Sequence, residues 1–155
     1  MIISKIGLTL TEADLNKVVE TAFAKIGEAN PEAAKKLKSP KVVLKDGTFV
    51  FKCKASMGIL PVPVEARIEF APAKDGTALD VTLTKVSMMM MGGAAGASAI
   101  MGQVATAVAG KPGLEVNGTT LTVDIATFAK MRDITLGGKL NYVEVKSGSL
   151  ALDFS

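Results

Sequence analysis

The sequence predicts an α+β fold in which an antiparallel β-sheet wraps around helices. Three patterns indicate it: an apolar stripe of helical period near the N-terminus, several segments that alternate apolar and polar residues, and an uncharged stretch between two groups of these segments. A chain of 155 residues has the size of one domain. We therefore expect residues 1–155 to form a single domain.

The first helix is expected to begin after Thr11. Thr11 and Asp14 resemble a capping box, with Asp in place of the usual Glu or Gln. An apolar stripe of helical spacing follows, made of Leu15, Val18, Val19, Ala22, Phe23 and Ile26. Asn30 and Pro31 predict a short second helical turn that ends before Pro40.

Beyond Pro40 the hydrophobic period changes from that of a helix to that of a strand. Strands are predicted over residues 41–44, 48–57, 62–70, 79–84 and 120–125, and as a pair within 136–154. A short helix is expected within 124–132, and the prolines of the 58–63 link suit a strand edge or an irregular connection. Because each strand has one apolar and one polar face, the sheet is expected to be antiparallel.

Residues 86–110 carry no charge and need an apolar partner. Their length permits a transmembrane helix, but few of them favour insertion strongly, so a buried helix or a helix lining an apolar ligand cavity is preferred. Glycines at 92, 93 and 96 predict that this second main helix begins near Ala94 or Ala97. The methionines at 88–91 suit a site for variable ligands, although Met also fills ordinary cores.

The chain is mildly basic, with a net charge of +3, and its lysines gather between residues 35 and 54. This cluster fits a solvated face or attraction to anionic lipid headgroups. No motif of a common nucleic-acid module is present, so a nucleic-acid partner is not expected. With one cysteine and no pattern of a secretory signal, the chain is predicted to be cytoplasmic.

The residue types present give little support for an enzymatic activity. The chain has no histidine, which excludes Ser-His-Asp and Cys-His arrangements and histidine-containing metal sites. Cys53 lies between two lysines, but its alternation with Phe49 and Phe51 predicts a buried thiol rather than a reactive one. We expect no catalytic residue, no metal and no cofactor.

Three segments carry a family resemblance: L-T-E-A-D-L-N at 10–16, V-D-I-A-T-F-A-K-M at 123–131 and L-G-G-K-L-N-Y-V-E-V-K-S-G-S-L-A-L-D-F at 136–154. With the strands and the apolar segment between them, the chain resembles the tubular lipid-binding (TULIP) superfamily, in particular its small bacterial single-domain members. The resemblance implies a strongly curved antiparallel sheet wrapped around two main helices. It also implies an apolar groove that binds or transfers lipids without catalysis.

The sequence therefore predicts a non-enzymatic protein that binds a lipid or another apolar small molecule. Its groove is expected to be lined by Val19, Phe23, Ile26, Phe49, Phe51, Ile68, Phe70, Val81, Leu83, Met88, Met91, Ile100, Met101, Val104 and Val108. Contact with a lipid headgroup or an anionic membrane is assigned to Lys35, Lys36, Lys38 and Lys41. The alternative is a structural or assembly protein of the same fold with a filled core, which forms homo- or hetero-oligomers.

Overall fold

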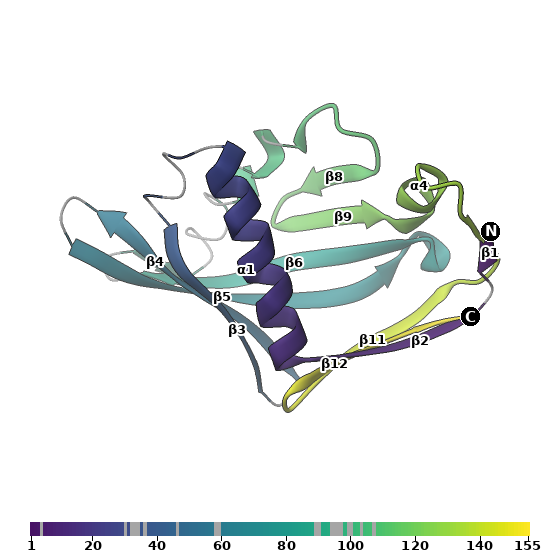
Figure 1. Ribbon diagram of the computed structural model, residues 1–155, viewed down its shortest axis with the longest axis horizontal. Coiled ribbons are helices and arrows are strands. Elements are labelled where there is room, and N and C mark those ends of the chain that lie inside the picture. The colour runs from purple at the N-terminus through teal and green to yellow at the C-terminus, as the bar shows by residue number, and fades with distance from the viewer. Residues whose placement is uncertain are drawn as a thin grey trace.

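The computed structural model is mostly β (Figure 1). It describes residues 1–3, 5–29, 31, 35, 37–45, 47–57, 60–88, 91–93, 98, 101–102, 104–106 and 108–155. Within these residues the strands form a large antiparallel sheet, a smaller antiparallel sheet and one short parallel pair.

The large sheet has seven strands in the order β3-β4-β5-β6-β9-β8, with β7 also paired to β6. Its strands are β3 (Leu37–Lys45), β4 (Thr48–Met57), β5 (Leu60–Ala73), β6 (Ala78–Met88), β7 (Met91–Gly93), β8 (Leu114–Asn117) and β9 (Thr120–Asp124). β9 and β7 share one edge of β6, because β9 pairs with its first half and β7 with its end.

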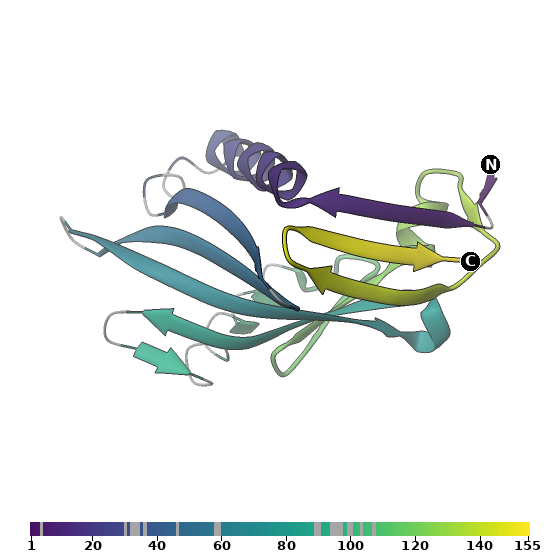
Figure 2. The same cartoon turned by 90° about the horizontal axis from the view of Figure 1, so that it is seen from below.

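The small sheet joins the two ends of the chain. Its three strands lie in the order β11-β12-β2 and are β2 (Ile6–Thr11), β11 (Leu140–Lys146) and β12 (Ser149–Phe154). Figure 2 shows this sheet stacked beside the large one, and β11 contacts β3, β4 and β5. The remaining elements are α1 (Glu12–Ala29), the 3-10 turn η1 (Lys74–Gly76), α4 (Ile125–Lys130) and the parallel pair β1 (Ile2–Ile3) and β10 (Thr135–Leu136).

The predicted α+β fold with two main helices is wrong. Among the described residues, α1 is the one helix of seven residues or more. In the uncharged stretch, residues 91–93 form β7, ahead of the expected start of the second helix. The described positions beyond it, 98, 101–102, 104–106 and 108, are helical, but they make up no described helix of seven residues or more. Strands β2 and β8 lie outside the predicted strand ranges and add further β structure. β2 pairs with β12 from the other end of the chain, whereas β8 forms a hairpin with the adjacent β9.

No helix in the described part of the chain has both the length and the apolar character needed to cross a bilayer.

Several local predictions are confirmed. Helix α1 begins directly after Thr11, whose backbone N–H donates to Asp14 Oδ2 at 3.0 Å. In return the Asp14 N–H donates to Thr11 Oγ1 at 3.1 Å, which completes the capping box. The β11–β12 hairpin turns at the predicted Ser147-Gly148, and α4 lies within the short helix predicted over 124–132.

The prolines at the start of β5 also fit their predicted setting at a strand edge. Pro61 and Pro63 pair with β4 on one side. On the other side the pairing with β6 begins only at Glu65. The missing proline N–H groups therefore break no ladder with β6 at this end of β5.

The core lies between the apolar face of the large sheet and the elements that cover it. Cross-strand register places Val42, Phe51 and Ala66 side by side on that face. One buried cluster contains Ala66, Leu83, Val86 and Met101, and the other contains Val42, Leu44, Phe49 and Leu150. Phe51 and Ile68 pack against both clusters, so the core is continuous.

Candidate ligand-binding site

Most of the predicted groove residues lie together in the core. Phe49, Leu83 and Met101 are 8%, 7% and 6% exposed. The half-buried members are Val19, Phe23, Phe51, Ile68, Phe70, Val81, Val104 and Val108. Ile100 lies outside the described residues, as do the side chains of Ile26, Met88 and Met91.

These core side chains contact one another. The ring centroids of Phe49 and Phe70 are 5.0 Å apart in an edge-to-face arrangement. Phe23 of α1 approaches Phe51 of β4 with centroids 5.8 Å apart. Val19 packs against one cluster and Val104 against the other. An apolar ligand would therefore have to bind where this core is less completely covered.

The apolar face of β2 is one such place. Its residues Leu8 and Ile6 pair in register with Leu152 and Phe154 of β12, so these side chains share one face of the small sheet. Phe154 is buried at 7% exposure, whereas Leu8 and Ile6 are 44% and 41% exposed. In the described part of the chain, β2 pairs with β12 alone, which leaves its other edge free.

A second incompletely covered part of the apolar face lies on β6 and β9. Register joins Val81 to Leu121 and Leu79 to Val123 across β6 and β9. All of these side chains are half-buried, in contrast to the buried Leu83 further along β6. On α4, which follows β9, Phe128 is 38% exposed. We call these residues of β6 and β9, together with Ile6 and Leu8, the open apolar margin.

The predicted headgroup lysines lie on the other face of the large sheet. Lys38 and Lys41 are exposed and stand opposite Lys54 and Lys52 of β4, on the face away from the apolar core. Lys35 is also exposed, and Lys36 lies outside the described residues. These lysines and the part of the open apolar margin on β6 and β9 are thus on opposite faces of the large sheet.

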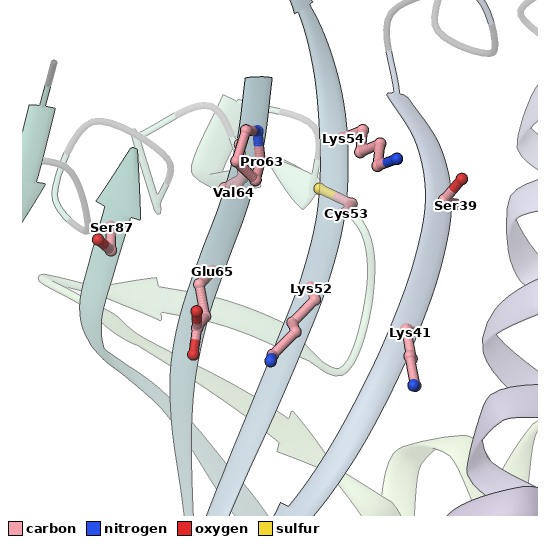
Figure 3. A pocket seen from close by; sticks show the side chains of 9 residues that line it. All are labelled: Ser39, Lys41, Lys52, Cys53, Lys54, Pro63, Val64, Glu65 and Ser87. Atoms are coloured by element: carbon pink, nitrogen blue, oxygen red, sulfur yellow. The ribbon is translucent and has the colours of Figure 1, made fainter. Parts of the chain in front are cut away.

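This polar face carries a hollow of about 590 Å³ that the sequence did not predict (Figure 3). It is lined by Ser39, Lys41, Lys52, Cys53, Lys54, Pro63, Val64, Glu65 and Ser87, and we call it the basic hollow. The lysine cluster was visible in the sequence. The hollow was not, because it depends on how three strands and the end of a fourth are aligned.

Cys53 is a buried thiol, as predicted. It is 7% exposed and alternates with exposed lysines along β4. Burial raises the pKa of this thiol, because the charged thiolate is poorly solvated inside the protein. Within the described residues, no group of three or more His, Cys, Asp or Glu side chains is arranged to hold a metal ion.

Comparisons with protein-family models, with curated proteins and with solved structures found no match to this chain.

Proposed function

We propose that this protein binds a lipid or another apolar small molecule without catalysing a reaction, at the open apolar margin. The observation that carries the proposal is the exposure of Ile6 and Leu8. Their register partners on β12 are less exposed, since Phe154 beside Ile6 is buried and Leu152 beside Leu8 is half-buried. A ligand lying over Ile6 and Leu8 would complete the cover that the protein itself leaves unfinished.

The energetics favour a ligand with an extended apolar part. Each methylene that leaves water for an apolar surface contributes about 0.8 kcal/mol. The half-buried Val81, Leu121 and Val123 offer further apolar surface on the large sheet. Affinity should therefore increase with chain length in a series of ligands that share one headgroup.

The ligand position proposed here differs from a groove between two helices. Val104 and Phe51 already pack against the core clusters. Val104→Asp would place a charge against that core and destabilise the fold. Loss of ligand uptake in this variant would therefore not show that Val104 contacts the ligand. Variants on β2 are better suited, because Leu8 is exposed and stands in a strand with one free edge.

A second candidate, assembly with another copy or another protein, is favoured by the free edge of β2. An unpaired strand edge exposes backbone N–H and C=O groups that can pair with another strand. The exposed Ile6 and Leu8 would then be covered by protein. Sedimentation velocity over a range of concentrations distinguishes this candidate, since it predicts a dimer or larger oligomer without added ligand.

The proposal is tested by titrating the protein with the neutral probe N-phenyl-1-naphthylamine, with Leu8→Asp and Thr9→Asp compared. Thr9 is the control because it is exposed and lies on the opposite face of β2. We expect saturable fluorescence with the unchanged protein and with Thr9→Asp, and at least tenfold weaker binding with Leu8→Asp. Equal binding by both folded variants would contradict the proposed location, and no saturable binding by the unchanged protein would contradict the function.

A further inference from the structure

The basic hollow lies on the polar face of β3, β4 and β5, opposite the apolar core. Three of its lining side chains are lysines, Lys41, Lys52 and Lys54, and they come from two neighbouring strands. Figure 3 shows Lys54 extending toward the strand that carries Ser39, while Lys41 and Lys52 extend along the strands in a common direction. Ser39 and Ser87 lie on the two sides of the hollow, and their hydroxyl groups point away from the lysines in Figure 3.

Positive charges are placed directly opposite one another at this site. Lys41 is the cross-strand partner of Lys52, and Lys38 is the partner of Lys54. Like charges in such positions destabilise a sheet. Among the described residues, none of the three lysines Lys41, Lys52 and Lys54 forms an ion pair with a carboxylate. Even Glu65, which is the partner of Lys52 on β5, forms none.

The backbone at the edge of the hollow is also irregular. The register of β3 against β4 shifts between Lys38 and Lys41, which marks a bulge. Within it, Ser39 has a φ of 54°, in the left-handed region that residues other than glycine seldom adopt. Bulges of this kind redirect side chains and are frequent beside binding sites. Here the bulge brings Ser39 to the lining of the hollow.

We propose that the basic hollow binds a small soluble molecule that bears phosphate groups with at least two negative charges. The lysine ammonium groups would pair with the phosphate oxygens. The Glu65 carboxylate would accept a hydrogen bond from a hydroxyl group on the organic part of the ligand. A volume of about 590 Å³ lies within the range of ligand pockets.

This site is separate from the open apolar margin and does not depend on the proposed function. The large sheet separates the basic hollow from the apolar residues of β6 and β9. One ligand therefore cannot occupy both sites through the sheet. We favour a small molecule over an anionic membrane, because a flat bilayer surface does not fit into a hollow. The phosphate headgroups of a membrane share the same chemistry, however, and the experiment separates the two sources.

The test is a calorimetric titration of the purified protein with inorganic pyrophosphate, in buffer free of divalent cations. The double variant Lys52→Gln/Lys54→Gln is compared with Lys130→Gln/Lys139→Gln, which removes the same charge at exposed positions outside the hollow. We expect saturable binding by the unchanged protein and the control, and at least tenfold weaker binding by the hollow variant. The affinity of the unchanged protein should also fall as salt concentration rises.

Three results would overturn the proposal. One is no saturable binding of pyrophosphate by the unchanged protein. Another is equal weakening in both double variants, which would show attraction to net charge alone. The last is binding to phosphatidylcholine vesicles containing phosphatidic acid, lost in the hollow variant, without any binding of pyrophosphate. That result would assign the lysines to a membrane surface.

Discussion

Asn16 of α1 hydrogen-bonds both backbone groups of Val42 in β3. The Val42 N–H donates to Asn16 Oδ1 at 2.8 Å, and Asn16 Nδ2 donates to the Val42 carbonyl at 3.0 Å. One turn earlier, Glu12 Oε2 accepts a hydrogen bond of 3.0 Å from the N–H of Leu44. The side chains of α1 thus take the place of a neighbouring strand along the outer edge of the large sheet (Figure 1).

Replacing Asn16 with Ala should destabilise the fold, because it leaves the N–H and C=O of the buried Val42 without these partners. We expect the free energy of unfolding to fall by about 1–3 kcal/mol, measured by urea denaturation. Asn16→Asp keeps an acceptor for the Val42 N–H but loses the donor to the Val42 carbonyl. Its free energy of unfolding should therefore lie between those of the unchanged protein and Asn16→Ala. An Ala variant as stable as the unchanged protein would show that water satisfies this edge equally well.

The capping box at the start of α1 predicts a pH dependence of stability. Hydrogen bonds from the Thr11 backbone and side chain lower the pKa of Asp14 below its ordinary value of 3.8. Because the folded-state pKa is the lower one, the carboxylate stabilises the fold above pH 3.8, and this contribution is lost as pH falls through the folded pKa. Asp14→Asn should therefore lower the melting temperature at pH 7.

The difference between Asp14→Asn and the unchanged protein should shrink as the pH is lowered below 3.8. Thermal melts followed by circular dichroism between pH 2 and pH 7 measure this difference. A gap that stays constant across this range would contradict the assignment of the pH effect to the Asp14 carboxylate.

Gly76 lies in the turn η1 between β5 and β6, where its backbone packs closely against the start of β11. It has a φ of +84°, and a Cβ there would lie 2.7 Å from the Lys139 Cβ and 2.9 Å from the Leu140 carbonyl oxygen. Gly148 also has a positive φ, of +79°, but a Cβ there would meet nothing within 4 Å. We expect Gly148→Ala to cost about 1–2 kcal/mol for backbone conformation alone.

Gly76→Ala should cost about 1–3 kcal/mol more than Gly148→Ala, since its methyl group overpacks the contact with β11. Chemical denaturation of the two variants side by side measures the difference. Equal losses would show that the backbone near Leu140 moves away without strain.

The opposed lysines predict that the charges of the basic hollow lower the stability of the fold. Lys54→Gln removes the repulsion with Lys38 and loses no opposite charge across β5, where its partner is Pro63, so it should raise the free energy of unfolding by about 0.2–1 kcal/mol in low-salt buffer. Lys130→Gln, at an exposed position on α4, should change it little. Loss of stability in Lys54→Gln would contradict the repulsion between Lys38 and Lys54 as the dominant effect at this position.

The elements predicted correctly from the sequence are those with strong local signals. Helix α1 has a capping box at Thr11 and a long apolar stripe, and the β11–β12 hairpin has its turn at Gly148. Each of these signals is formed by residues inside the element itself or next to its end. Local physical chemistry is therefore sufficient to find them.

Strand β2 was missed because it depends on contacts between distant parts of the chain. Ile6, Leu8 and Leu10 do alternate, but the segment is short and becomes a strand by pairing with β12 at the other end of the sequence. A single-sequence pattern does not contain such a pairing. The prediction of a second main helix is wrong for another reason, because positions 98, 101–102, 104–106 and 108 are helical but form no described helix of seven residues or more.

In the candidate sites too, local sequence patterns predicted which residues are apolar or basic, but not what covers or faces them. The sequence indicated that Phe49 and Leu83 face an apolar interior, and both are buried. It did not show that Ile6 and Leu8 would remain exposed beside the buried Phe154, because exposure depends on what covers β2. The lysines of the basic hollow were apparent as a cluster, but their direct opposition follows from register across the β3 bulge.

The most direct test of apolar ligand binding is native mass spectrometry of the purified protein, followed by solvent extraction and analysis of what it carries. We predict a non-covalent adduct with the mass of a phospholipid, fatty acid or isoprenoid, present on purification or after incubation with mixed lipids. The adduct should be reduced in Leu8→Asp and retained in Thr9→Asp. A protein that keeps its unliganded mass throughout would contradict the proposed function and favour assembly through β2.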